Sequence, residues 1–287
     1  MVFFKKGNVG PEIVKIQTAL IATGALINPD GRFGAITEMA VKRFQQDHNL
    51  KVDGRVGDDT WAELFLGGPI THIPTPPPKT FGQFTAARIV TAMRNKNFRL
   101  DEGLFRSNLI YVEGMNVDGQ SNQHIKNTFD DVRSLVVILP EGPKLLGIWE
   151  ATTRPGKYWT EHRMNPRGAA RVRLGQQTAW IMGKYNGMNA LRQDGYLELT
   201  RDPDETYERY GPLYRSNDTG IHHHGGYNYP HDDLGRSSAG CLVGRSMDEH
   251  EVAMQFLKKD ERFRADSNFH FTSTILEYKD LPEIEIA

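Results

Sequence analysis

A proline- and glycine-rich stretch early in the chain most constrains what it can fold into. Residues 67–83 contain Gly67-Gly68-Pro69 and the run Thr75-Pro76-Pro77-Pro78. Such sequences favour extended, semi-rigid backbone and cannot enter a helix or a central strand. The chain has 287 residues, which is enough for two domains. We therefore predict a small domain over residues 1–66, a linker over residues 67–83 and a larger domain over residues 84–287.

Charge and hydropathy exclude several classes of partner. The chain carries 35 basic and 36 acidic residues, so it has no basic field that would attract nucleic acid. Its longest apolar run, residues 135–139, is too short to span a membrane. The first residues lack the apolar run and small-residue cleavage site of a signal peptide. A single cysteine, Cys241, excludes an internal disulfide. No sequence signal sets an oligomeric state.

Residues 7–66 have the pattern of three short helices. Ile13, Ile16, Leu20 and Ile21 recur at helical spacing after Pro11, which predicts one apolar helix face. Residues 37–46 and 59–65 read as a second and a third helix. Two similar Asp-Gly turns precede these two helices, and Asp-Gly supplies positive φ at low energetic cost. The turns are Asp30-Gly31-Arg32-Phe33-Gly34 and Asp53-Gly54-Arg55-Val56-Gly57.

This N-terminal pattern resembles the widespread peptidoglycan-binding domain. The resemblance implies a role in holding cell-wall glycopeptide, with peptidoglycan as the partner. Most of the matching residues are core and turn positions, so no individual contact residue is implied. The matching positions are Gln17, Leu20, Gly24, Asp30-Gly31, Phe33-Gly34, Thr37, Ala40-Val41, Phe44-Gln45, Leu50, Val52-Asp53-Gly54, Gly57, Thr60-Trp61 and Leu64.

The pattern changes after the linker, where short apolar runs recur between Gly, Pro and Asn. Strands are predicted at residues 109–114, 135–139, 145–151 and 269–278, and helices at residues 86–96 and 247–258. These elements predict a mostly β domain over residues 84–287. The fold class expected for the whole chain is therefore α+β and multidomain.

The candidate chemistry lies between residues 220 and 245. The segment Ile221-His222-His223-His224 reads as a strand end, and strand alternation places His222 and His224 on one face and His223 on the other. Fifteen residues separate His222 from Ser238. That length suits a loop which returns beside the histidines. Small residues surround Cys241 and leave room for an acyl group, and an imidazole can convert the thiol to the reactive thiolate. The small neighbours are Ser237, Ser238, Ala239, Gly240 and Gly244.

This spacing resembles the catalytic motif of the L,D-transpeptidase (YkuD-like) cysteine enzymes, in which a His-Gly segment is followed by Ser-His-Gly-Cys and an arginine. Here Ala239 and Val243 stand at the positions of the family's second histidine and its arginine, and Arg245 is the nearest arginine. The resemblance implies an L,D-transpeptidase-like β-sandwich or barrel. It also implies that Cys241 attacks the carbonyl of an L-centre next to a D-residue in a stem peptide. The resulting thioester passes to an amine in transpeptidation, or to water in hydrolysis by a carboxypeptidase or endopeptidase.

Roles for the surrounding residues follow from that resemblance. His222, or alternatively His224, would hold the thiolate as an ion pair and protonate the leaving amine, and the sequence favours His222 because of its loop length. Backbone N–H groups around Gly240 and Cys241 would stabilise the oxyanion. The candidate substrate contacts are Arg245, which could bind a carboxylate, Ser238, which could instead shape the turn, and Tyr227, which could line a cleft. No cofactor or metal is expected in this reading.

Two alternatives remain open at this stage. The first is a zinc-dependent wall amidase or peptidase that uses the His222–His224 cluster with His231, Asp232, Asp233 or Cys241. Since strand neighbours point to opposite faces, at most two of the three histidines could share one metal. The second alternative is a non-catalytic wall-binding protein. Asp130-Asp131 is assigned to a turn without catalysis. All three hypotheses place the site of action in the cell wall, the periplasm or an extracellular space, as for an endolysin.

Overall fold

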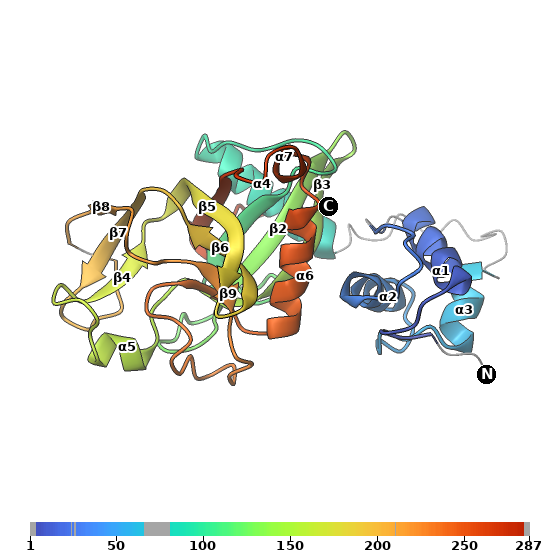
Figure 1. The fold of residues 1–287 in the computed structure, drawn as a ribbon, viewed down its shortest axis with the longest axis horizontal. Coiled ribbons are helices and arrows are strands. Elements are labelled where there is room, and N and C mark those ends of the chain that lie inside the picture. Colours follow the sequence, from blue (N-terminus) through green and yellow to red (C-terminus); the bar gives the residue numbers. More distant parts are fainter. Residues whose placement is uncertain (1–3, 24, 26, 66–80, 210, 284–287) are drawn as a thin grey trace. The chain divides into compact units, whose positions relative to one another are not determined.

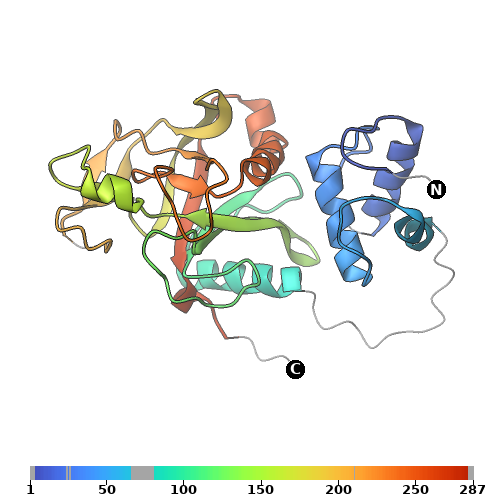
Figure 2. The same ribbon diagram turned by 90° about the horizontal axis from the view of Figure 1, so that it is seen from below.

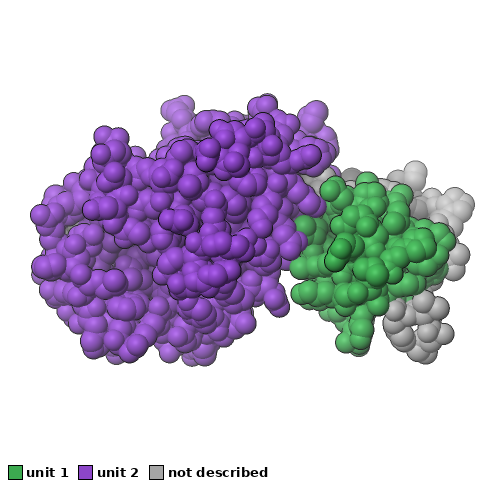
Figure 3. Space-filling view, in the orientation of Figure 1, with its two compact units in different colours: residues 1–77 green, residues 78–287 purple. Residues whose placement is uncertain are grey.

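The computed structural model describes residues 4–23, 25, 27–65, 81–209 and 211–283. The chain divides into two compact units, residues 1–77 and residues 78–287, which Figure 3 colours separately. Most of the predicted linker lies outside the described residues. Its last three positions, residues 81–83, belong to helix α4 (Phe81–Asn95), so this helix begins earlier than the sequence predicted.

Unit 1 contains the three predicted helices, α1 (Pro11–Ala22), α2 (Ala35–Asp47) and α3 (Asp58–Phe65). Proline in the first turn of α1 is favoured because that turn needs no intrahelical N–H donor. Ile13, Ile16 and Leu20 are at most 1% exposed, as the periodicity predicted. Ile21 is 38% exposed, which corrects its expected inward orientation. Ile21 follows Ile13 by eight residues, and this spacing places it at the edge of the apolar stripe rather than within it.

A buried glutamine holds each Asp-Gly turn of unit 1. The Gln17 amide donates to the Asp30 carboxylate at 2.8 Å and to the Thr37 hydroxyl at 3.0 Å. Its carbonyl accepts the Gly31 N–H at 2.9 Å. Gln45 repeats this arrangement in the second turn, where its partners are Asp53 (3.1 Å), Thr60 (3.1 Å) and the N–H of Gly54 (2.9 Å). The sequence repeat is therefore also a repeat of side-chain contacts.

Unit 2 is built on a closed eight-stranded barrel in the order β1-β11-β5-β6-β9-β10-β3-β2, with a separate three-stranded sheet in the order β4-β7-β8 (Figure 1). The barrel strands are β1 (Asn108–Glu113), β2 (Asp131–Leu139), β3 (Gly142–Thr152), β5 (Gly175–Tyr185), β6 (Met188–Gln193), β9 (His223–Gly225), β10 (Leu242–Gly244) and β11 (Phe271–Glu277). The small sheet contains β4 (Ala169–Val172), β7 (Leu197–Asp202) and β8 (Tyr214–Ser216).

Helices α4 and α6 (Met247–Lys258) lie on separate sides of the barrel (Figures 1 and 2). Ile89 and Met93 of α4 pack in one core cluster with Val132, Val136 and Ile138 of β2. Because β2 is covered on both faces, all but its last residue are buried. Three shorter helices complete the unit: α5 (Lys157–Glu161), α7 (Glu261–Ala265) and the 3-10 turn η1 (Tyr278–Asp280).

The fold class predicted from the sequence, a small helical domain followed by a mostly β domain, is confirmed. The four predicted strands correspond to β1, β2, β3 and β11, and the predicted helix at residues 247–258 is α6. The small sheet, strands β5, β6 and β10, and helices α5 and α7 were not predicted. Most of these segments are short or rich in charged and polar residues, so they carry little periodic signal.

Candidate active site

Parallel pairing of β9 and β10 brings the histidine strand beside the cysteine turn. His223 pairs with Leu242, and His224 pairs with Val243. The Leu242 N–H donates to the His222 carbonyl at 2.9 Å, so the alignment continues back to His222 and Cys241. Because paired residues project to the same face, the side chains of Cys241, His222 and His224 share one side of these strands.

The Cys241 thiol is nearly buried, with 8% of the residue exposed. The sulfur accepts the backbone N–H of His222 at 3.4 Å, and the thiol donates to the Gly220 carbonyl at 3.7 Å. Burial raises the pKa of the thiol to about 11, against a smaller lowering by the His222 N–H. At neutral pH the sulfur is therefore protonated. The imidazole–thiolate hydrogen bond expected from the sequence is not among the contacts of the described residues.

The three histidines alternate between two faces, as the strand pattern predicted. The rings of His222 and His224 both contact Tyr185, at centroid distances of 4.9 and 4.8 Å. His223 lies on the other face, where its Nδ1 is 3.0 Å from the Tyr111 hydroxyl and its ring meets Trp180 edge-on at 4.4 Å.

Hydrogen bonds fix different tautomers for the two histidines near the thiol. His222 Nδ1 accepts the Gln193 backbone N–H at 3.0 Å, so the proton of the neutral ring is on Nε2. His224 Nδ1 lies 2.9 Å from the Gly225 carbonyl, which requires an N–H at Nδ1 and leaves a lone pair on Nε2. Of the two, His224 has the tautomer that can accept a proton at its outer nitrogen.

Burial keeps both rings uncharged at neutral pH. Burial, together with the neighbouring His224 and Arg192, lowers the pKa of His222 to about 4. Burial also lowers the pKa of His224, while the Gly225 carbonyl partly opposes this effect. Neither ring is an imidazolium in the resting protein. This corrects the expected ion pair with a thiolate.

Tyr185 lies against the two histidines on the face of the thiol. Burial raises the pKa of Tyr185 first, and the charges of Cys241 and Tyr227 raise it further. Tyr227, one of the predicted substrate contacts, is 51% exposed, and its hydroxyl accepts a hydrogen bond from Asn186 at 3.1 Å. Tyr227 is therefore accessible from solvent.

Ser238 and Gly240 shape the turn that presents Cys241. The fully buried Ser238 hydroxyl donates to the Cys241 carbonyl at 2.8 Å and accepts the Gly240 N–H at 3.2 Å. Ser238 is thus a turn residue rather than a substrate contact. The Gly240 N–H is already bonded, which corrects its expected use as an oxyanion donor. Gly240 has φ +127°, and a Cβ there would lie 2.7 Å from the Ala170 carbonyl oxygen.

Arg245, the predicted carboxylate ligand, is already paired. Its Nε donates to the Glu150 carboxylate, and its Nη1 lies 3.4 Å from the Tyr229 carbonyl. His231 Nδ1 contacts the other oxygen of the same carboxylate at 2.9 Å. Because Arg245 is paired with Glu150, its guanidinium is not free to bind a substrate carboxylate with two parallel hydrogen bonds.

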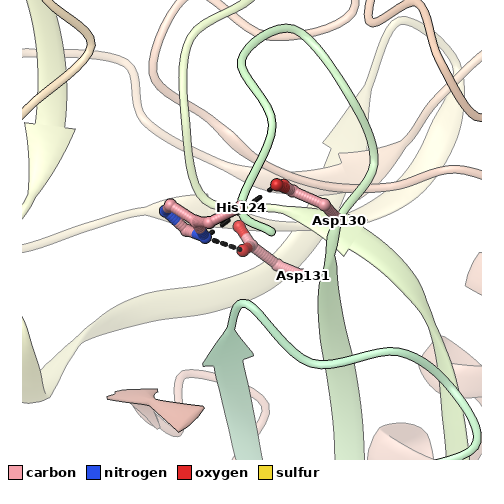
Figure 4. Close-up of side chains that lie close together, drawn as sticks. All are labelled: His124, Asp130 and Asp131. Atoms are coloured by element: carbon pink, nitrogen blue, oxygen red, sulfur yellow. Dashed lines mark ion pairs between the residues drawn. The ribbon is translucent and has the colours of Figure 1, made fainter. Parts of the chain in front are cut away.

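The cluster of potential metal ligands in the described part of the chain lies elsewhere, at His124, Asp130 and Asp131 (Figure 4). Their ligand atoms lie within 4.8 Å of one another. The protein already engages both carboxylates: Asp130 pairs with Arg154, and Asp131 accepts the Thr153 N–H at 2.8 Å. Burial and the nearby Glu113 raise the pKa of Asp131 to about 7. This arrangement fits an internal polar network better than a cation site.

Comparison with known proteins identifies unit 1. A family model described as "Putative peptidoglycan binding domain" matches residues 9–64. The solved SleB N-terminal domain is 31% identical, over 22% of this chain and 88% of that chain, with a TM-score of 0.22. Residues 9–64 belong to the peptidoglycan-binding domain family. This confirms the sequence prediction for the N-terminal domain and supports peptidoglycan as a binding partner.

Two solved structures align with nearly the whole chain at low similarity. One is a fused Zn-dependent amidase/peptidase/peptidoglycan-binding domain-containing protein from Clostridium acetobutylicum, at 17% identity, covering 96% of this chain and 99% of that chain, with a TM-score of 0.30. The other is an L,D-transpeptidase (Yku) from Stackebrandtia nassauensis, at 14% identity, covering 95% and 94%, with a TM-score of 0.27. At these values neither structure discriminates between the transpeptidase and amidase hypotheses. None of the described helices has the length and apolar character needed to cross a membrane.

Proposed function

We propose that this protein is a cell-wall enzyme in which Cys241 attacks L,D peptide bonds of peptidoglycan stem peptides. One observation carries the proposal: the parallel pairing of β9 with β10 puts Cys241 on the same face as His222 and His224. The peptidoglycan-binding domain supplies the context, because it would hold the wall near unit 2 and raise the local substrate concentration.

His224 is the general base in this proposal, in place of His222, which the sequence favoured. Its Nε2 lone pair can take the thiol proton, while the Gly225 carbonyl stabilises the charge that forms on the ring through Nδ1–H. His222 cannot gain a proton at Nδ1 without breaking its bond to the Gln193 N–H. Its Nε2–H can instead donate to the developing negative charge.

The reaction then follows two acyl-transfer steps. The Cys241 thiolate adds to the carbonyl of the L-residue, and the C–N bond to the D-residue breaks as Nε2–H of His224 protonates the leaving amine. The thioester is released by a second amine, which makes a cross-link, or by water, which gives hydrolysis. The resting thiol is protonated and bonded to Gly220, so substrate entry has to displace that contact before proton transfer.

Digestion of purified wall by the intact chain and its variants tests the proposal, with mass spectrometry of the released peptides. We expect Cys241→Ala to abolish turnover while sedimentation with insoluble wall is retained. His224→Gln should lower the rate by about 100-fold or more, the range typical of a general base, and His222→Gln should lower it less.

Two outcomes would contradict this assignment. Equal turnover by Cys241→Ala would remove the thiol from the chemistry, and a larger loss in His222→Gln than in His224→Gln would reverse the roles of the two rings. Treatment with a chelator tests the zinc hypothesis in the same assay. Full activity after removal of bound metal rejects that hypothesis, and a complete loss that added zinc restores supports it.

A further inference from the structure

The three-stranded sheet carries arginine side chains next to the cysteine turn. Ala170 of β4 pairs with Arg201 of β7. Gly240 packs directly on Ala170, since a Cβ at Gly240 would lie 3.1 Å from the Ala170 Cβ and 2.7 Å from its carbonyl oxygen. Directly opposed residues of antiparallel strands lie about 5 Å apart and project to the same face. Arg201 therefore emerges on the face of this sheet that meets the cysteine turn.

A second arginine lies close to the first. The Arg167 guanidinium sits 5.1 Å from the centre of the Tyr214 ring, and Tyr214 of β8 shares the face of Arg201 because it pairs with Leu199. Burial lowers the pKa of Arg201, and the charge of Arg167 lowers it further. Arg201 also bonds to the backbone of Gly168, the residue that follows Arg167, so the two arginines lie on neighbouring parts of this sheet.

No acidic side chain among the described residues forms an ion pair with Arg167 or Arg201. Arg201 Nη1 donates to the Gly168 carbonyl at 3.1 Å, which orients the guanidinium without neutralising it. The charge of Asp218 favours the charged form of Arg201, but its effect on the pKa is smaller than those of burial, Arg167 and Tyr214. The Asp218 carboxylate itself accepts a hydrogen bond from the Ser216 hydroxyl.

Such a pair of guanidiniums suits an anion. An arginine presents several N–H donors in a rigid fork that matches a carboxylate, and an anion placed between two of them removes their mutual repulsion. A stem peptide that ends in a D-amino acid carries a carboxylate at that end. Arg245, the arginine nearest the thiol in sequence, is engaged by Glu150 and does not fill this role.

We propose that Arg201 and Arg167 form a subsite for a carboxylate of the peptide whose L,D bond Cys241 attacks. This subsite rests on the proposed function and specifies it further. The substrate is an anionic peptide, and arginines at the small sheet bind its carboxylate. Arg201 is the inner ligand because it is half-buried and oriented by Gly168, and Arg167 is the exposed outer ligand.

The test measures binding rather than turnover. In full-length Cys241→Ala protein, calorimetry would compare a short stem peptide that ends in a D-amino-acid carboxylate with the same peptide ending in a carboxamide. We expect the parent to bind the carboxylate form about tenfold more tightly, a difference of about 1.4 kcal/mol, because hydrogen bonds between charged groups are stronger than those to a neutral amide. Arg201→Gln and Arg167→Gln should each remove most of that preference and leave carboxamide binding unchanged.

Arg215→Gln is the matched control. Arg215 also lies over a tyrosine ring, at 4.5 Å from the centre of Tyr196, but it pairs with Glu198 and so projects from the other face of the same sheet. This variant should keep the preference of the parent. Because the Arg167 side chain is exposed, Arg167→Gln keeps the test valid if Arg201→Gln does not fold.

Two results would overturn the subsite: equal binding of the two peptides by the parent, or an unchanged preference in folded Arg167→Gln and Arg201→Gln. Failure of the proposed function would look different. If Cys241→Ala retained turnover of wall while both arginine variants lost the carboxylate preference, the subsite would stand and the cysteine mechanism would fall.

Discussion

Gly240 shows how one residue can fix the geometry of the turn that leads into Cys241. Its φ of +127° is a conformation that residues with a side chain rarely adopt, and a Cβ at this position would lie 2.7 Å from the Ala170 carbonyl oxygen. Any Cβ there would meet backbone, which cannot move aside as a flexible side chain can. Glycine before Cys241 is therefore a steric requirement of this turn.

We expect Gly240→Ala to destabilise unit 2 by about 2 kcal/mol or more, the sum of backbone strain and a steric clash. It should also reduce turnover of wall peptides strongly, because the turn must shift and Cys241 must move with it. Urea denaturation and the wall-digestion assay measure the two effects.

The control for this prediction is Gly142→Ala. Gly142 also has a positive φ, +120°, but no atom lies within 4 Å of its added Cβ. This variant carries only the backbone strain and should keep the position of Cys241. If both variants lose stability and activity equally, the contact with Ala170 has no special role.

At the scale of elements, the two glutamine-held turns explain how a unit as small as unit 1 keeps its loops in place. Gln17 and Gln45 are each 1% exposed, and each bonds to an aspartate, a threonine and a turn amide. Buried amides need such partners, and the loss of one leaves several donors and acceptors unpaired. Each glutamine therefore joins its own helix to the turn that starts the next helix.

We predict that Gln45→Ala lowers the free energy of unfolding of unit 1 by about 2–4 kcal/mol, because it leaves a cavity and unpaired groups. The matched control is Gln46→Ala, at the adjacent exposed position of α2, which should change stability by less than about 0.5 kcal/mol. Thermal unfolding and wall sedimentation of both variants provide the comparison. Equal stability of the two variants would show that the hydrogen bonds of Gln45 contribute nothing to the free energy of unfolding.

At the scale of the whole molecule, the interior of unit 2 contains histidines that are held neutral. Burial is the first cause that lowers the pKa of His222, to about 4, and of His223, His224 and His250. Arg133 adds to this effect at the last three, and its Nη1 lies 2.8 Å from His250 Nδ1. An arginine can only donate, so His250 must accept and stay uncharged at that nitrogen.

Because these histidines are neutral in the folded protein, we expect unit 2 to lose stability in acid. In the unfolded chain these histidines bind protons near pH 6.5, whereas in the folded chain they bind protons only at lower pH. The free energy of unfolding should therefore fall as pH drops from about 6.5 towards 4. Asp131 acts in the opposite sense. Its folded pKa is raised to about 7, so its contribution is full below its unfolded pKa and is lost as pH rises through about 7. Four histidines outweigh one carboxyl, and the net change should be a loss.

Urea midpoints measured between pH 7 and pH 4 check this expectation. His222→Gln should flatten the slope, because glutamine does not titrate, provided that the variant folds at pH 7. A midpoint that stays constant or rises as pH falls would contradict the assignment of neutral histidines in the folded state.

Features that depend on near neighbours along the chain were predictable from the amino-acid order. Unit 1 was predicted from helical periodicity and its Asp-Gly turns, and the end of this domain was predicted from the proline-rich stretch that follows it. Strand alternation placed His223 on the opposite face from His222 and His224. Strands β1, β2 and β3 were also predicted, because each contains an apolar run, and β11 was predicted because its residues alternate. These signals are local because they reflect backbone geometry and the burial of one face.

Tertiary structure decided which side chains meet. The tautomer of His222, which prevents it from accepting a proton, depends on the backbone N–H of Gln193, which lies on another strand. Arg245 looked available until Glu150, 95 positions earlier in the chain, proved to hold it. Hydrogen bonds and ion pairs form between groups that folding brings together from distant parts of the sequence, and no local pattern records which partner reaches which atom.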